Sequence, residues 1–194
     1  ILIGLVGSEM CIRDSVTTAS ADVPLKGLDY LLEAFSKVVQ IFPESTLEVI
    51  GSSKKGGHTT RKIKDLSIKD KVHFNKDLSF KEVRDLYCSS DIVVIPSLYE
   101  GFGFAIGEAM ACRAPVITTS GGAIPEVIGN CGITVAPGNS KELEEAMLKL
   151  LPDENLKNSL AEKGFNRIIE QLQWKEAAKL MTESYEAEIK RMTE

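Results

Sequence analysis

The sequence predicts a doubly wound α/β fold, in which helices cover both faces of a parallel sheet. From Val16 onward, short β-rich runs alternate with segments of helical periodicity. The run Ile92–Ile95 (IVVI) is continuously apolar and β-branched, which is typical of a central parallel strand. The length of 194 residues suits one domain with a helical tail. Ligands on such sheets bind outside the carboxyl ends of the strands.

The individual elements follow from local patterns. Apolar residues between Leu28 and Phe42 recur at steps of three and four, which predicts a helix that ends before Pro43. Ser79 and Glu82 are spaced as a capping box, and Ser140 is the expected N-cap of a later helix. We expect strands at 46–50, 71–75, 92–95, 115–119 and 132–136, and further helices at 61–66, 104–112, 124–128, 140–151, 153–169 and 174–191.

Composition narrows the class of protein. The net charge is −5 and no basic block stands out, so nucleic acid is not an expected partner. The spacings of the four cysteines match no zinc or redox pattern, which predicts reduced thiols, with Cys88, Cys112 and Cys131 in the core. No apolar run approaches the ~20 residues of a transmembrane helix. We therefore expect a cytoplasmic protein, and contact with the inner face of the membrane stays open.

The amino end differs from the rest of the chain. Residues 6–15 read VGSEMCIRDS, which resembles translated sequencing-adapter read-through. We expect residues 1–15 to be a sequencing artefact or a disordered leader, with a genuine strand at 1–6 and a loop as the alternative. In the first case the natural chain was cut before Val16, and the part that preceded it is lost.

The segment most informative for chemistry is PSLYEGFGFAIGE, from Pro96 to Glu108. It follows the buried strand 92–95, so it lies at a carboxyl end of the sheet. Its glycines, including Gly107, allow a ligand to approach the backbone, and a helix from about Phe104 directs free N–H groups toward an anion. Glu100 and Glu108 flank this spot, and carboxylates accept hydrogen bonds from hydroxyl groups. Diphosphate between two carboxylates fits a nucleotide sugar.

The stretch EGFGFAIGEAMACRAPVI, followed by GGAIPEVI, resembles the E-x7-E signature and following loop of family-4 retaining glycosyltransferases. These enzymes have the GT-B architecture of two facing Rossmann-like domains. The resemblance covers about 16–185 and implies the C-terminal, donor-binding half of such an enzyme, with the N-terminal domain missing. It implies a Rossmann-like domain at 16–172 and a helix at 173–194 that crosses to that missing domain.

The resemblance also implies roles for particular residues. Glu100 and Lys26 are the catalytic candidates: Glu100 would contact the donor sugar and Lys26, in the K-G motif, the diphosphate. Glu108 would hold the ribose hydroxyls. The remaining donor-binding candidates are Gly101, Phe102, Gly103, Phe104 and Ala105 in the loop, Gly51 after the strand 46–50, and Asn75 near the base. For Lys26, a solvated surface lysine is the alternative.

One departure from the family concerns the diphosphate. Many members have an arginine about five residues before the lysine, whereas this region reads Thr18-Ala19-Ser20-Ala21-Asp22. Either Lys26, Ser20 and backbone donors suffice, or Lys54 or Lys55 replaces the arginine.

The predicted function is retaining transfer from a nucleoside-diphosphate sugar to a hydroxyl acceptor, which is a lipid, a glycan or a small molecule. The family implies no cofactor and no metal. We expect this fragment alone to bind donor weakly and to catalyse little. The alternative is a non-catalytic nucleotide- or sugar-binding module on the same fold. The sequence contains no G-x-x-x-x-G-K-[ST] and no G-x-G-x-x-G after the first strand, which argues against P-loop enzymes and dinucleotide dehydrogenases.

Overall fold

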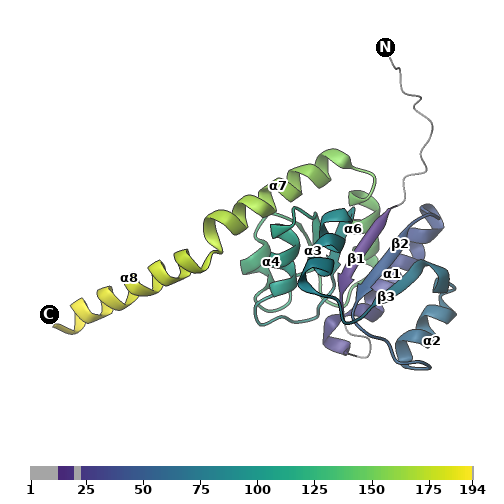
Figure 1. The fold of residues 1–194 in the computed structure, drawn as a ribbon, viewed down its shortest axis with the longest axis horizontal. Helices are drawn as coiled ribbons and strands as arrows, with labels where there is room; N and C mark the ends of the chain where they lie inside the picture. Colours follow the sequence, from purple (N-terminus) through teal and green to yellow (C-terminus); the bar gives the residue numbers. More distant parts are fainter. Residues whose placement is uncertain (1–12, 20–22, 194) are drawn as a thin grey trace, which may run out of the picture.

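A parallel sheet in the order β3-β2-β1-β4-β5-β6 forms the centre of the computed structural model, which describes residues 13–19 and 23–193 (Figure 1). The order confirms the doubly wound α/β fold that the strand–helix alternation predicts. Within those residues the strands are β1 (Asp14–Thr18), β2 (Thr46–Ile50), β3 (Val72–Asn75), β4 (Ile92–Ile95), β5 (Val116–Thr119) and β6 (Ile133–Val135).

In the described part of the chain, an α-helix connects each pair of consecutive strands, and further helices follow β6. They are α1 (Leu28–Ile41), α2 (His58–Asp65), α3 (Phe80–Ser89), α4 (Phe104–Ala111), α5 (Ile124–Ile128), α6 (Ser140–Leu150), α7 (Glu154–Gln171) and α8 (Trp174–Thr193), with short 3-10 helices η1 (Pro24–Lys26) and η2 (Lys69–Lys71). Helices α1 and α6 pack together on one face, while α4 contacts α3, α5 and α7 on the other.

Strand β4 separates two hydrophobic cores. Ile92 and Val94 belong to the core beneath α1 and α6, whereas Val93 and Ile95 belong to the core beneath α4 and α5. All four side chains are buried, as expected for a strand covered on both sides. The continuous apolar run in the sequence is therefore explained by the two helical layers.

The observed start of α3 agrees with the predicted cap, whereas the starts of α6 and α2 differ from the predictions. The Ser79–Glu82 capping box is present, with both reciprocal hydrogen bonds. Helix α6 is capped by Asn139 instead of Ser140, because the Asn139 side chain accepts the backbone N–H of Glu142. Helix α2 begins at His58, three residues before the predicted start, since its first turn is polar and lacks the apolar periodicity on which the prediction depends.

The first strand begins earlier than the sequence indicates. Asp14 and Ser15 pair with Thr46 and Leu47 of β2, and Ser15 is buried. These two residues fall inside the segment 1–15, which we expected to be an artefact or a leader. The rest of that segment up to residue 12, including Cys11, lies outside the described residues.

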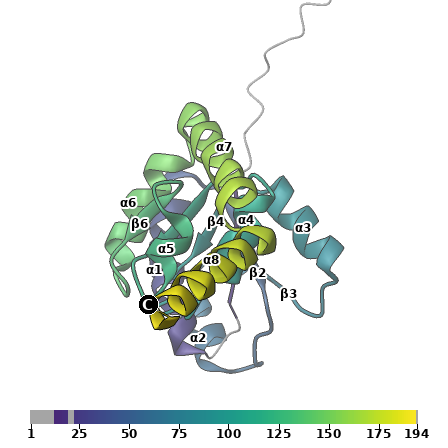
Figure 2. The ribbon, with the colours of Figure 1, turned by 90° about the vertical axis from the view of Figure 1, so that its left-hand side faces the viewer.

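Helix α8 projects away from the sheet in Figure 1, and it lies in front of the other elements in the view of Figure 2. Its large apolar side chains are exposed; they are Leu180, Met181, Tyr185, Ile189 and Met192. In the part of the chain that the structure describes, no helix is both long and apolar enough to cross a membrane. The assignment of all three later cysteines to the core is wrong for Cys88, which is exposed near the end of α3.

Candidate functional site

The order of the strands reverses direction between β1 and β4. From β1 the chain proceeds to β2 and β3 on one side, and from β4 to β5 and β6 on the other. The two strands are direct neighbours, with Ser15 opposite Ile92. In doubly wound sheets, ligands bind at such a reversal of strand order, outside the carboxyl ends of the two strands.

Lys26 lies at this end of the sheet because η1 packs against the segment after β4. A Cβ atom on Gly27 would lie 1.9 Å from the carbonyl oxygen of Pro96, and Gly27 has a φ of +67°. Glycine thus allows both the left-handed turn and the close backbone approach. The backbone N–H of Leu98 donates to the carbonyl of Leu25 at 2.8 Å. The two segments are consequently held side by side.

This packing places Lys26 on Glu100. The ammonium Nζ lies 2.7 Å from Glu100 Oε1, and the two residues are 74 positions apart in sequence. The buried Ser97 hydroxyl donates to the same oxygen, also at 2.7 Å. Sequence reasoning did not identify Ser97 as a partner of Glu100, although the dipeptide Pro96-Ser97 before the motif was a signal.

The backbone of Glu100 is fixed from the opposite side by the glycine turn before α5. Glu100 and Gly122 form an isolated parallel bridge, and the N–H of Ala123 donates to the Glu100 carbonyl at 2.9 Å. A Cβ atom on Gly122 would lie 2.3 Å from that carbonyl oxygen. The loop that carries Glu100 is thus anchored at both its backbone and its side chain.

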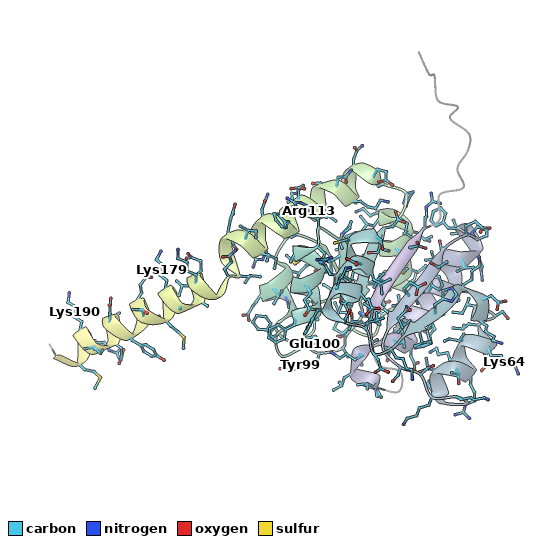
Figure 3. All side chains as sticks on the ribbon, viewed as in Figure 1. Lys64, Tyr99, Glu100, Arg113, Lys179 and Lys190 are labelled. Atoms are coloured by element: carbon cyan, nitrogen blue, oxygen red, sulfur yellow. The ribbon has the colours of Figure 1, made fainter. Side chains whose placement is uncertain are left out.

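The loop from Gly101 to Ala105 leads directly into α4. Gly103 is the N-cap, with a φ of +90°, and no side chain caps the helix. Among the described residues, the backbone N–H groups of Phe104 and Ala105 have no hydrogen-bond partner. The rings of Phe102 and Phe104 stack with centroids 4.5 Å apart, and both are exposed. The helix start therefore offers free donors beside two exposed rings, and Figure 3 labels the neighbouring Tyr99 and Glu100 at this rim.

Gly107 lies on the side of α4 that faces α7. A Cβ atom there would meet the Ile168 side chain of α7 at 3.7 Å. On α7 itself, a Cβ atom on Gly164 would lie 3.2 Å from Met110. The 3.2 Å approach shows that Gly164 allows close packing of α7 against α4, whereas 3.7 Å at Gly107 is an ordinary van der Waals distance. The approach of a ligand to the Gly107 backbone stays a prediction.

Glu108 lies in the second turn of α4 with an exposed side chain. Its carboxylate has no hydrogen-bond partner among the described residues. The surrounding protein nevertheless removes part of its hydration, and this burial raises the pKa of Glu108 above the ordinary 4.5. The buried Tyr87 on α3 lies close enough for the Glu108 charge to raise the pKa of its phenol as well. Both oxygens of the Glu108 carboxylate are thus available to accept hydrogen bonds from a ligand.

Gly51 and Asn75 share a hollow of about 320 Å³ at the ends of β2 and β3. The N–H of Gly51 donates to the carbonyl of Asn75 at 2.9 Å. The Asn75 side chain donates to Glu48, so its amide nitrogen is already used within the sheet. Lys54 and Lys55 are exposed in the following loop and form no ion pair within the described residues, whereas Ser20 lies outside them.

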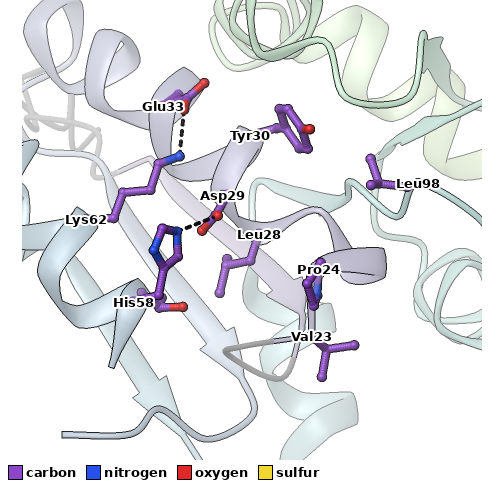
Figure 4. A pocket seen from close by; sticks show the side chains of 10 residues that line it. Val23, Pro24, Leu28, Asp29, Tyr30, Glu33, His58, Lys62 and Leu98 are labelled. Atoms are coloured by element: carbon purple, nitrogen blue, oxygen red, sulfur yellow. Dashed lines mark hydrogen bonds and ion pairs between the residues drawn. The ribbon is translucent and has the colours of Figure 1, made fainter. Parts of the chain in front are cut away.

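A larger pocket of about 440 Å³ lies between α1 and α2 and contains none of the predicted site residues (Figure 4). A hydrogen bond and an ion pair cross it: His58 Nε2 lies 2.7 Å from Asp29 Oδ2, and Lys62 Nζ lies 2.6 Å from Glu33 Oε1. The sequence did not indicate this pocket because its charged groups come from two separate segments. Over residues 13–19 and 23–193, no three His, Cys, Asp or Glu side chains gather as a metal site.

Comparison with known proteins identifies the class. A family model described as "Glycosyl transferases group 1" matches residues 13–153, so the chain belongs to this glycosyltransferase family. It is 34% identical over 180 residues to the MMP alpha-(1->4)-mannosyltransferase of Mycolicibacterium hassiacum. The matched region covers 91% of this chain and 44% of that protein. The chain thus spans less than half the length of this relative.

Solved structures agree with this assignment. The C-terminal domain of the group 1 glycosyltransferase LpcC from Francisella tularensis is 26% identical, with a TM-score of 0.73, and the match covers 84% of this chain and 89% of that domain. Anabaena HepE, solved with UDP-glucose, shares the fold at 22% identity and a TM-score of 0.77; the match covers 92% of this chain and 50% of HepE. The sheet is the Rossmann-like fold of GT-B C-terminal domains, which confirms the resemblance found in the sequence.

Proposed function

We propose that this chain is the donor-binding half of a retaining hexosyltransferase, which moves a sugar from a nucleoside diphosphate to a hydroxyl acceptor. The observation that carries the proposal is the Lys26–Glu100 pair, 2.7 Å apart at the reversal of strand order. A cation and a carboxylate at this point match the two chemistries of a nucleotide sugar, the diphosphate and the hydroxyl groups.

Each part of the donor has a counterpart along the rim. The base would lie at the hollow of Gly51 and Asn75, and the ribose hydroxyls would donate to Glu108. The diphosphate would lie between Lys26 and the free N–H groups of Phe104 and Ala105, where charge and helix dipole both favour an anion. Glu100 would receive a hydroxyl of the sugar. The structures of HepE with UDP and with UDP-glucose support a donor of this kind.

These groups also suggest how the reaction is promoted. In a front-face mechanism the departing diphosphate gains negative charge and helps to deprotonate the acceptor. Lys26 and the start of α4 would stabilise that charge electrostatically, without a metal or a cofactor. Either Lys26, Ser20 and backbone donors would suffice for the diphosphate, or the exposed Lys54 or Lys55 would replace the family arginine.

The acceptor, which is a lipid, a glycan or a small molecule, would bind mainly to the domain that relatives have beyond the matched region. The exposed apolar side chains of α8, among them Tyr185 and Ile189, would pack on that domain. We accordingly expect the present chain to bind donor weakly and to transfer little sugar. We expect the whole enzyme to be cytoplasmic.

The test is calorimetric titration of the chain with UDP, GDP and ADP. We expect one of the three to bind, and Glu108→Gln to weaken it about tenfold or more, because a hydrogen bond to a charged acceptor is lost. Glu126→Gln, an exposed control in α5, should change the affinity less than about twofold. Absence of binding by all three nucleotides, or an unchanged affinity in Glu108→Gln, would contradict the donor site.

A further inference from the structure

The two oxygens of the Glu100 carboxylate are used unequally. Both Lys26 Nζ and Ser97 Oγ bind Oε1, each at 2.7 Å. Oε2 has no hydrogen-bond partner among the residues that the structure describes. A carboxylate has about four acceptor positions. Two of them are therefore occupied on one oxygen, and the other oxygen is left for a ligand.

The two partners of Oε1 differ in mobility. The Lys26 side chain is 40% exposed and lies on a flexible four-carbon stem. Ser97 is 0% exposed, and its own carbonyl accepts a hydrogen bond from the buried Thr119 hydroxyl at the end of β5. Ser97 is thus a fixed donor that is held between β4 and β5, whereas Lys26 is free to exchange one anionic partner for another.

We propose that Ser97 is a positioning residue that anchors Glu100 through Oε1 and so presents Oε2 to a hydroxyl group of the donor sugar. This inference rests on the proposed function and refines it. A diphosphate would draw the Lys26 ammonium away from Oε1, and the Ser97 hydroxyl would keep that oxygen satisfied. The orientation of the carboxylate then no longer depends on Lys26.

If Ser97 has this role, its substitution should affect the recognition of the sugar and of the nucleotide differently. Loss of the Ser97 hydroxyl should weaken recognition of the sugar, because Glu100 would lose its fixed orientation. It should leave recognition of the nucleotide unchanged, since Lys26, Glu108 and the start of α4 do not depend on Ser97. A merely structural role for Ser97 would affect both halves together.

The experiment compares the Kd of a nucleoside diphosphate with that of its sugar conjugate, using UDP and UDP-glucose, GDP and GDP-mannose, or ADP and ADP-glucose. The pair is the one whose nucleotide binds to the wild-type chain. In Ser97→Ala we expect the sugar conjugate to bind about tenfold more weakly, with the nucleotide unchanged within about twofold. Ser97→Cys keeps the volume with a weak donor, so it should behave like Ser97→Ala.

A double-mutant cycle with Glu100→Gln completes the test. Ser97→Ala should cost nothing further in the Glu100→Gln background, because its effect acts through that carboxylate. The inference would be overturned, while the nucleotide site stands, if Ser97→Ala weakened both ligands equally or weakened neither. It would also be overturned if Ser97→Cys bound the sugar conjugate with full affinity, or if the two ligands had an equal Kd in the wild type. If no nucleoside diphosphate binds to the wild type, the proposed function itself fails, and this role fails with it.

Discussion

The backbone of Gly27 touches the carbonyl oxygen of Pro96 so closely that no side chain fits between them; a Cβ atom would lie 1.9 Å from that oxygen. This contact joins the segment after β1 to the segment after β4, and it places Lys26 beside Glu100. Packing between the two segments that follow β1 and β4 thus brings Lys26 and Glu100 together without a ligand.

Substitution of Gly27 tests this contact. Gly27→Ala should lower the free energy of unfolding by at least about 3 kcal/mol, because a steric clash adds to the cost of a left-handed alanine. Gly56→Ala is the matched control: its φ is +73° and no atom lies within 4 Å of the added Cβ, so it should cost only about 1 kcal/mol. Urea denaturation measures both. Equal losses in the two variants would show that the approach to Pro96 relaxes freely.

The raised pKa of Glu108 predicts how nucleotide binding depends on pH. Burial favours the neutral carboxyl, so Glu108 becomes protonated at a higher pH than an ordinary glutamate with a pKa of 4.5. Only the carboxylate accepts from both ribose hydroxyls, and affinity should therefore fall as the pH decreases through the raised pKa. The ratio of Kd between wild type and Glu108→Gln removes the titration of the nucleotide itself. A ratio that does not change with pH would contradict this role.

A buried lysine links α7 to the residue that precedes β4. Lys157 Nζ lies 2.7 Å from Asp91 and 2.6 Å from Glu154, and its side chain is 7% exposed. We expect Lys157→Met to lower the free energy of unfolding by about 1–3 kcal/mol, because Asp91 loses its counter-charge. Lys141→Met removes an exposed pair and should cost less than about 0.5 kcal/mol. Thermal unfolding distinguishes the two, and a neutral Lys157→Met would show that the pair adds no net stability.

Tyr87 predicts a loss of stability at alkaline pH. Burial raises the pKa of its phenol to about 12, against the opposing effect of the hydrogen bond with Thr18. The neutral phenol of Tyr87 contributes fully to the free energy of unfolding below the unfolded-state pKa of tyrosine, about 10. This contribution is lost as the pH rises through the folded-state pKa, which lowers the free energy of unfolding by about 2–3 kcal/mol. Tyr87→Phe should therefore show a smaller loss of stability than wild type above about pH 10.

Tyr185→Phe is the control for this measurement, because Tyr185 is exposed on α8 and should leave the alkaline profile as it is in the wild type. Denaturant unfolding at a series of alkaline pH values provides the comparison. Parallel profiles for wild type and Tyr87→Phe would mean that ionisation of Tyr87 does not affect stability.

Local signals in the sequence were sufficient for the order of the elements. The apolar run 92–95, the helical periodicity from Leu28 and the Ser79–Glu82 box each involve residues a few positions apart, and each matches the structure. The motif after β4 lies at a carboxyl end of the sheet, as the sequence predicts, and the binding of a ligand there stays a prediction. Where local signals were weak, as in the polar first turn of α2, the observed start of the helix differs from the predicted one by three residues.

Only the tertiary structure determined which groups meet. Lys26 and Glu100 are 74 residues apart, and their contact depends on the parallel pairing of β1 with β4 and on the backbone approach at Gly27. The close approach of Gly164 to α4 and the exposure of α8 also depend on the tertiary structure. The sequence by itself determined the fold class and the residue types at the rim, because periodicity and turn chemistry act over short distances. The distances between those residues depend on how separate layers pack, and no local pattern encodes them.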